Sequence, residues 1–317
     1  MSGLPVELAC RLALCPLERL WLVDGLWADQ AVGIVGGEPK CCKSFLALDM
    51  AVAVASGTPC LRRFPVTRPG RVLLFAAEDA LHVVRARLEG IARAAGVRLA
   101  DLDIHVITAP SVRLDVADDQ RRLADTVAEL RPRLLILDPL VRLHRVDENV
   151  ASEVAPLLAY LRELQRTHQV AVVLVHHARK GAGRLRAGQA LRGSSELHAW
   201  GDSNLYLRRV DDQLLLSVEH RAAASHGGLA LGLRGAGDVL ALEVLDPTSV
   251  VAASKPVEPS VADKVEQLLV DAAAPVRLAA LRKSCRIRAA TLGDALADLQ
   301  RTGKIRKTAA GFELVSR

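Results

Sequence analysis

Residues 37–44 have the types and spacing of a loop that binds phosphate. They read GEPKCCKS and follow the pattern G-x-x-x-x-G-K-[ST], except that Cys42 stands where the pattern has its second glycine. The backbone N–H groups of such a loop hold phosphate oxygens, the lysine reaches the β and γ phosphates, and the hydroxyl binds Mg²⁺. We therefore expect Gly37 to make the turn into the loop, Lys43 to bind phosphate and Ser44 to bind Mg²⁺. The predicted ATP-binding residues are Gly37, Glu38, Pro39, Lys40, Cys41, Cys42, Lys43, Ser44 and Phe45.

Cys42 is the departure from this pattern, and it follows another cysteine. A side chain at this position costs roughly 1–2 kcal/mol if the backbone is left-handed, so we expect weaker nucleotide binding rather than none. The vicinal Cys41 and Cys42 also suggest a redox switch, because a thiolate at a helix start has a lowered pKa. Small residues in a tight loop explain both cysteines without regulation, and we favour that interpretation.

Two other apolar stretches end in carboxylates. The stretch RLLILDP contains an apolar strand that ends in Asp138, where a carboxylate can hold the water shell of Mg²⁺. RVLLFAAED ends in Glu78 and Asp79, and a glutamate at the carboxyl edge of a sheet can orient and deprotonate an attacking water. These residues predict Mg²⁺-dependent ATP hydrolysis with Glu78 as the base and Asp79 as the next candidate.

A sheet must bring these residues together, and the sequence has the βαβ rhythm of a parallel one. Runs such as LLIL and VAVVLV suit strands that are buried on both faces. The expected strands are 31–35, 71–77, 104–108, 133–138 and 170–177, and the expected helices are 44–55, 80–96 and 150–168. Antiparallel strands are expected to extend the sheet at 204–210, 213–220 and 239–246. The phosphate loop then lies between a strand and a helix, as this chemistry requires.

The chain is predicted to contain two domains. Residues 1–30 form an amphipathic lead-in in which Trp21 and Trp27 cover an edge of the ATPase domain, residues 31–249. Residues 250–260 are small and include two prolines, which indicates a linker. Helices are then expected at 262–273, 277–285 and 289–303, followed by a hairpin at 304–315. This order is that of a winged helix, so the predicted second domain is 261–317.

Composition excludes several classes of protein. A chain of 317 residues, half of them apolar, is long enough for one large domain and a small one. It has no run of about eighteen apolar residues and no secretory signal order, so we expect a cytoplasmic protein with no membrane partner. The cysteines show no C-x-x-C pair and no zinc spacing, which predicts free thiols at Cys10, Cys15, Cys41, Cys42, Cys60 and Cys285.

Five stretches resemble the RecA-like P-loop ATPases of the RepA-type hexameric plasmid helicase group. They are, in order, GGEPKCCKSFLALDMA, LLFAAEDALHVVRARL, LLILDPLVRLHRVDENVAS, VVLVHHARKG and LRGSS, within about residues 20–220. The resemblance implies a ring-forming ATPase, with Glu78 as the catalytic glutamate and His177, or alternatively His176, as the γ-phosphate sensor. It also implies Arg192 as the arginine finger that a neighbouring subunit supplies.

A basic segment in HHARKGAGRLRAGQALRGSS is the first candidate for DNA contact. In a RecA-like ring such a segment would be a mobile loop that faces the central channel and grips the phosphates of a single strand. A solvated surface loop is the alternative. The predicted DNA-binding residues of this segment are Arg179, Lys180, Arg184 and Arg186.

The C-terminal domain is the second candidate. Residues 261–317 hold 11 Lys/Arg against 6 Asp/Glu, a net of +5, which is nearly all of the chain's net charge of +6. Asp294 and Asp298 would repel phosphates from the presumed recognition helix, so docking of a protein is the alternative to duplex DNA. The predicted phosphate contacts are Arg286, Arg288, Lys304, Arg306 and Lys307.

These features together predict a hexameric DNA helicase or translocase, driven by ATP hydrolysis, that acts in replication of a plasmid or mobile element. The basic domain extends beyond a minimal helicase core, which leaves a second function open. That alternative is a non-motor DNA-binding ATPase that loads or regulates partners at a replication or recombination site.

Overall fold

A computed structural model describes most of the 317 residues. Outside the described residues lie 1–3, 5, 15, 17–18, 178–194, 211–212, 237–238, 246–264, 266–267, 271, 273–274, 286–291, 293–295, 297–298, 301–303, 309 and 315–317. The chain divides into two compact units, Met1–Val250 and Val251–Arg317. Within the described part, no helix has the length and apolar character that crossing a membrane requires.

A nine-stranded sheet runs through the first unit in the order β11-β10-β9-β8-β3-β7-β6-β4-β5. Its strands are β3 (Val32–Gly37), β4 (Val72–Ala76), β5 (Ile104–Val106), β6 (Leu134–Asp138), β7 (Ala171–His177), β8 (Ser203–Val210), β9 (Gln213–His220), β10 (His226–Ala236) and β11 (Val239–Val244). Neighbours from β5 to β8 pair in parallel, and neighbours from β8 to β11 pair antiparallel. This mostly parallel sheet is the α/β architecture that the sequence predicts.

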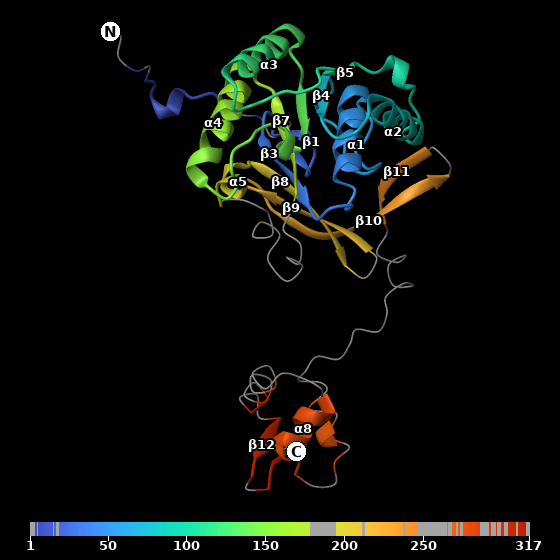
Figure 1. Cartoon of the computed structure of the whole chain (residues 1–317), viewed down its shortest axis with the longest axis vertical. Coiled ribbons are helices and arrows are strands. Elements are labelled where there is room, and N and C mark those ends of the chain that lie inside the picture. Colours follow the sequence, from blue (N-terminus) through green and yellow to red (C-terminus); the bar gives the residue numbers. More distant parts are fainter. Residues whose placement is uncertain are drawn as a thin grey trace. The chain divides into compact units, whose positions relative to one another are not determined.

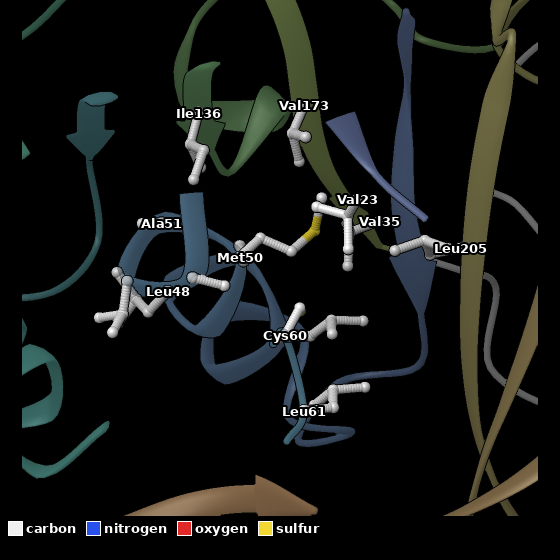
Figure 2. Close-up of a cluster of buried hydrophobic side chains, with 14 of the residues drawn as sticks. Val23, Val35, Leu48, Met50, Ala51, Cys60, Leu61, Ile136, Val173 and Leu205 are labelled. Atoms are coloured by element: carbon white, nitrogen blue, oxygen red, sulfur yellow. The ribbon is translucent and has the colours of Figure 1, made fainter. Parts of the chain in front are cut away.

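Helices cover both faces of the sheet, as Figure 1 shows. The helices α1 (Lys43–Ser56) and α2 (Leu81–Ala94) lie on one face, and α3 (Ala117–Leu130), α4 (Ala151–His168) and α5 (Ser195–Trp200) lie on the other. Successive strand residues point to opposite faces, so Val35 of β3 packs in the first core and Ile34 in the second. In the first core, Figure 2 shows the side chain of Met50 among Val23, Val35, Ile136, Val173 and Leu205. Burial of these apolar faces on both sides holds the strands in one layer.

The N-terminal part joins this core more closely than the expected lead-in would. After a short 3-10 turn η1 (Ala9–Arg11), strands β1 (Trp21–Val23) and β2 (Trp27–Ala28) form an antiparallel hairpin. Leu22, Leu26 and Trp27 are 0 % exposed and belong to the first core. The hairpin is therefore part of the packed core.

Two elements of the first unit have no counterpart among the expected ones, and a third pairs differently from the expectation. The helix α3 buries two residues, Leu123 and Val127, so its apolar signal is weak. The strand β10 is rich in glycine, which in sequence favours turns, yet it pairs with β9 on one side and β11 on the other. The strand β8, expected to be antiparallel, pairs in parallel with β3 and antiparallel with β9.

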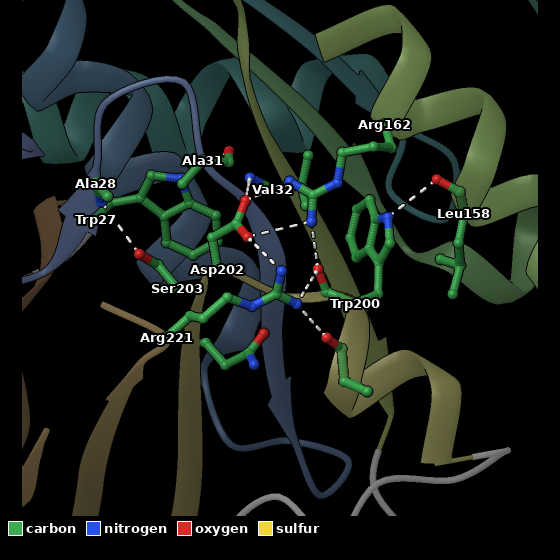
Figure 3. A network of polar contacts seen from close by, with 12 residues as sticks. Trp27, Ala28, Ala31, Val32, Leu158, Arg162, Trp200, Asp202, Ser203 and Arg221 are labelled. Atoms are coloured by element: carbon green, nitrogen blue, oxygen red, sulfur yellow. Dashed lines mark hydrogen bonds and ion pairs between the residues drawn. The ribbon is translucent and has the colours of Figure 1, made fainter. Parts of the chain in front are cut away.

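A polar network fastens β8 to its neighbours (Figure 3). The Asp202 carboxylate accepts hydrogen bonds from the backbone N–H of Val32, at 3.2 Å, and from the Arg162 guanidinium of α4. Arg162 also donates to the carbonyl of Trp200 at 2.6 Å, and the Arg221 guanidinium lies 3.4 Å from Asp202. Hydrogen bonds to charged groups are the stronger ones, so this network helps to hold β8 beside β3.

The second unit has a core of its own. Its described elements include α8 (Leu278–Cys285) and an antiparallel pair, β12 (Ile305–Lys307) and β13 (Phe312–Leu314). Lys304, Arg306 and Lys307 are exposed on this pair or directly before it. The buried residues of the core are Val265, Leu269, Leu281, Leu292, Leu296, Leu299, Ile305 and Phe312.

Candidate nucleotide-binding site

The parallel sheet brings the carboxyl ends of β3, β7, β6 and β4 to one edge, where a cavity of about 310 Å³ lies. Ligands in open α/β sheets bind outside the carboxyl ends of the strands. Cavity-lining residues from the predicted site are Lys40, Cys41, Cys42, Lys43, Ser44, Phe45, Glu78, Asp138 and His177. The structure thus brings together residues up to 137 positions apart in the chain.

Lys43 begins α1 and is 5 % exposed. Its Nζ donates to the carbonyl oxygen of Glu38 at 2.8 Å, which ties the loop to the start of the helix. Burial lowers the pKa of Lys43, while the carboxylates of Asp138 and Glu78 act in the opposite direction. The lysine is therefore a desolvated donor at the base of the cavity.

Cys42 has the left-handed backbone that the phosphate-loop pattern reserves for glycine. It is the N-cap residue of α1, with φ 58° and ψ 25°. The predicted cost of roughly 1–2 kcal/mol therefore applies. Burial raises the pKa of both Cys41 and Cys42, and a raised pKa disfavours the reactive thiolate. The burial of these two thiols therefore argues against the redox switch. Among the described residues, Cys10, Cys41, Cys42 and Cys60 are free cysteines.

Gly37 lies against a neighbouring strand that leaves no room for a side chain. It is the last residue of β3, and it pairs with His177 of β7 on one side and Leu207 of β8 on the other. A Cβ at this position would lie 2.3 Å from the carbonyl oxygen of Leu207. The missing side chain thus admits the backbone of β8 and also begins the loop.

Asp138 ends β6 beside Ala76, the last residue of β4. Burial raises the pKa of Asp138 to about 6; a hydrogen bond from Ser44 opposes this rise, and the charge of Asp79 adds to it. The buried carboxylate and the hydroxyl that is hydrogen-bonded to it offer two oxygen ligands, the ligand type that Mg²⁺ prefers.

Glu78 and Asp79 follow β4 and point to different partners. The Glu78 carboxylate accepts a hydrogen bond from Arg142 Nε at 3.0 Å and is 43 % exposed. Asp79 pairs with Arg87 of α2, whose guanidinium lies 5.2 Å from the ring centre of Phe45. Both carboxylates line the cavity, and each is paired with an arginine.

The two histidines at the end of β7 have different surroundings. His177 lines the cavity, and burial lowers its pKa, with the charge of Lys43 acting in the same direction. His176 is 1 % exposed and faces Glu148. Of the two sensor candidates, His177 is the one at the cavity.

Arginines in and beside the site have no counterpart among the predicted residues. Arg87 lines the cavity, Arg142 contacts Glu78, and the charge of Arg209 on β8 acts on both loop cysteines. Their sequence neighbourhoods carry no motif for these contacts, because each depends on how helices and strands pack. The predicted residues Arg179, Lys180, Arg184, Arg186, Arg192, Arg286 and Arg288 lie outside the described residues.

Comparison with known proteins agrees with this site. Among solved structures, the crystal structure of the RadB recombinase is similar at 16% sequence identity with a TM-score of 0.49, over 69% of this chain and 92% of that one. The family described as AAA domain matches residues 9–183, which is more than half of the chain and includes the phosphate loop, Glu78, Asp138 and His177. The chain therefore belongs to the AAA domain family.

Proposed function

We propose that this protein is a Mg²⁺-dependent ATPase that drives a hexameric DNA helicase or translocase in replication of a plasmid or mobile element. The observation that carries the proposal is the meeting of Lys43, Ser44, Glu78, Asp138 and His177 around one cavity. Phosphoryl transfer depends mainly on positioning and on stabilisation of charge. These side chains are of the types that do both.

The residue roles follow from their surroundings. Lys43 and the N–H groups at the start of α1 bind the β and γ phosphates. Ser44 and Asp138 would hold Mg²⁺, which would supply positive charge beside the phosphate oxygens. Glu78 orients and deprotonates the attacking water, and His177 contacts the γ phosphate. The fit of Mg²⁺ is supported by the hydrogen bond between Ser44 and Asp138.

Replacement of Lys43 tests the ATPase. Lys43→Ala should abolish ATP hydrolysis, measured as phosphate release, because it removes the buried cation at the base of the cavity. Arg98→Ala is the matched control, since its side chain is 81 % exposed and pairs with Asp101 away from the cavity. If folded and assembled wild-type protein neither binds nor hydrolyses ATP, the left-handed Cys42 has defeated the site and the proposal is wrong.

Replacement of Glu78 tests the base. Glu78→Gln should retain ATP binding and lose turnover, because the amide cannot accept the proton of the attacking water. Asp79→Asn is the parallel variant, since this carboxylate is engaged by Arg87. Equal turnover in Glu78→Gln and wild type would move the base elsewhere, with Asp79 next.

Assembly into a hexamer with shared sites is the second part of the proposal. Subunits that carry Arg192→Ala, mixed with subunits that carry Lys43→Ala, should regain part of the activity if Arg192 acts on the neighbouring site. No recovery at any mixing ratio would indicate a site completed within one chain.

A non-motor ATPase that binds duplex DNA and loads or regulates partners is the second candidate function. It is favoured by the separate core of the second unit and by the exposed Lys304, Arg306 and Lys307. Arg306 Nε lies 2.7 Å from Glu313 Oε1, so this arginine is already paired within the hairpin. A strand-displacement assay run beside a duplex-binding assay distinguishes the two functions.

Neutralising Lys304, Arg306 and Lys307 to glutamine should weaken duplex binding and reduce the slope of log affinity against log salt. Each phosphate contact that is lost changes the slope by about 0.9. Arg277→Gln, an exposed cation of the same unit outside β12 and β13, is the control. Unchanged affinity and slope would favour protein docking by this unit.

A further inference from the structure

A buried polar cluster lies at the end of β7 and belongs to none of the roles above. Its members are His144 and Glu148 from the segment between β6 and α4, and His176 of β7. Their side chains are 3 %, 14 % and 1 % exposed. Glu148 Oε1 lies 3.4 Å from His144 Nε2 and 3.8 Å from His176 Nδ1. One carboxylate oxygen therefore faces two imidazoles.

The carboxylate of Glu148 is charged although it is largely buried. Burial acts to raise the pKa of Glu148, but the imidazoles of His144 and His176 outweigh it and hold that pKa below its usual value. A buried charge is costly unless it has a partner of opposite charge or a hydrogen-bond donor. His144 Nε2 and His176 Nδ1 face this oxygen at ion-pair distance and make no hydrogen bond to it, so the charge is compensated electrostatically.

The segment that carries Glu148 is anchored on both sides of it. Asp147 Oδ1 accepts the N–H of Asn149 at 2.9 Å, and Glu153 Oε2 accepts the N–H of Asp147 at 2.8 Å. On the other side, the backbone N–H of Arg145 donates to Asp115 at 3.1 Å. Glu148 is thus presented to β7 from a backbone that its neighbours fix.

His176 and His177 connect this cluster with the nucleotide cavity. They are successive residues of one strand, so their side chains point to opposite faces of the sheet. His177 lines the cavity, and His176 faces Glu148. A displacement of the β7 backbone at His176 would therefore also move His177.

The same segment, residues 140–148, also contacts Glu78 at the cavity. Residues Leu140–Arg142 form the 3-10 turn η4, which packs beside β7, and Arg142 Nε donates to Glu78 at 3.0 Å. One short segment thus touches Glu78 through Arg142 and the end of β7 through Glu148.

We propose that Glu148 is a positioning residue of the nucleotide site, which holds His176 in place and thereby directs His177 at the γ phosphate. This inference deepens the proposed ATPase function and rests on it. Glu148 does not touch the nucleotide in this account. Its effect is on turnover, because a small displacement of a group that contacts the γ phosphate costs more in the transition state than in binding.

The test uses full-length Glu148→Gln, which keeps the shape of the side chain and removes its charge. We expect kcat for ATP hydrolysis to fall by about tenfold or more, with the Kd for ATP changed by less than about threefold. Glu153→Gln is the matched control: the glutamine amide oxygen can still accept the N–H of Asp147, so one carboxylate charge is removed while the segment stays anchored. Its kcat should stay within about twofold of wild type, even where urea unfolding shows a similar loss of stability.

A spectroscopic measurement keeps the test independent of activity. In nucleotide-free protein, Glu148→Gln should shift the ring-nitrogen signals of His176 and His177 in long-range ¹H–¹⁵N spectra. Glu153→Gln should leave the ring-nitrogen signals of His177 unchanged. If Glu148→Gln does not fold, Glu148→Asp keeps the charge but withdraws it by one methylene, and the same shift with a smaller loss of kcat is expected.

The outcomes separate this inference from the proposed function. Wild-type hydrolysis with equal kcat in Glu148→Gln, or an equal loss in Glu153→Gln, overturns the positioning role and leaves the ATPase intact. Absence of hydrolysis in the wild type overturns the ATPase, and the His177 signal then decides alone whether Glu148 directs that ring. Unchanged ring-nitrogen signals of His177 in Glu148→Gln would show that the inference is wrong.

Discussion

The phosphate loop and the opposite wall of the cavity are built in different ways. The loop is eight consecutive residues, and its internal contact from Lys43 to the Glu38 carbonyl spans five positions. The wall consists of Glu78, Asp138 and His177, which follow or end three strands separated by long stretches of chain. The loop therefore depends mainly on local sequence, and the wall depends on strand order.

Each region also carries a different energetic cost. The loop holds Cys42 in a left-handed backbone, which is a local conformational cost. The wall holds the carboxylate of Asp138 in a buried place near Asp79 and Glu78, which is an electrostatic cost. Function-bearing sites commonly retain such costs because the surrounding fold compensates them.

Replacement of Gly37 should have the largest effect and would show where the loop stops being local. A Cβ there would meet the Leu207 carbonyl at 2.3 Å, so Gly37→Ala must move β3 away from β8. We expect a loss of about 3 kcal/mol or more in the free energy of unfolding, measured with urea.

Gly25→Ala is the control for Gly37→Ala. Gly25 also has a positive φ, of 65°, but a Cβ there would meet no described heavy atom within 4 Å. Its expected cost is the backbone strain alone, about 1 kcal/mol. Equal losses in the two variants would mean that the approach of β8 to Gly37 is unimportant.

Replacement of Asp138 tests the free-energy cost of burying a carboxylate charge in the wall. The pKa of Asp138 is about 6 in the folded chain against an ordinary 3.8, so the folded state binds the proton more tightly. The free energy of unfolding therefore falls as pH rises from about 4 to 6, and the full cost is present above pH 6. Asp138→Asn should raise stability at pH 7.5 by roughly 2–3 kcal/mol in EDTA.

The measurement for Asp138→Asn is urea unfolding at pH 5 and pH 7.5, beside ATP hydrolysis in Mg²⁺. The variant should gain stability mainly at the higher pH and should lose hydrolysis. A variant that is less stable than wild type at pH 7.5 would show that the Ser44 hydrogen bond outweighs the buried charge.

Replacement of Cys42 should have the smallest effect. The left-handed backbone is already present before nucleotide binds, so its cost falls on folding rather than on affinity. Cys42→Gly should raise the free energy of unfolding by about 1 kcal/mol or less, because glycine relieves the strain but loses more entropy on folding. The Kd for ATP should change by less than about twofold, in contrast to the weaker binding expected from sequence. A gain of tenfold in affinity would show that Cys42 strains the bound state instead.

The sequence by itself determined the phosphate loop, the strands that end in carboxylates and the βαβ rhythm. Lys43, Ser44, Glu78 and Asp138 could be named in advance, because short spacings and runs of apolar residues depend on neighbours along the chain. His177, with His176 as its alternative, was named only through the family resemblance. The low apolar content of α3 and the glycines of β10 concealed those elements, because both weaken the local apolar pattern.

Only the tertiary structure decided the rest of the site. The parallel pairing of β8 with β3 explains Gly37 through the carbonyl of Leu207. Packing of the segment after β6 brings Arg142 to Glu78 and Glu148 to His176. These contacts join residues 28 to 170 positions apart, and no local pattern specifies them, because the free energy that selects them comes from burying helices and strands against one sheet.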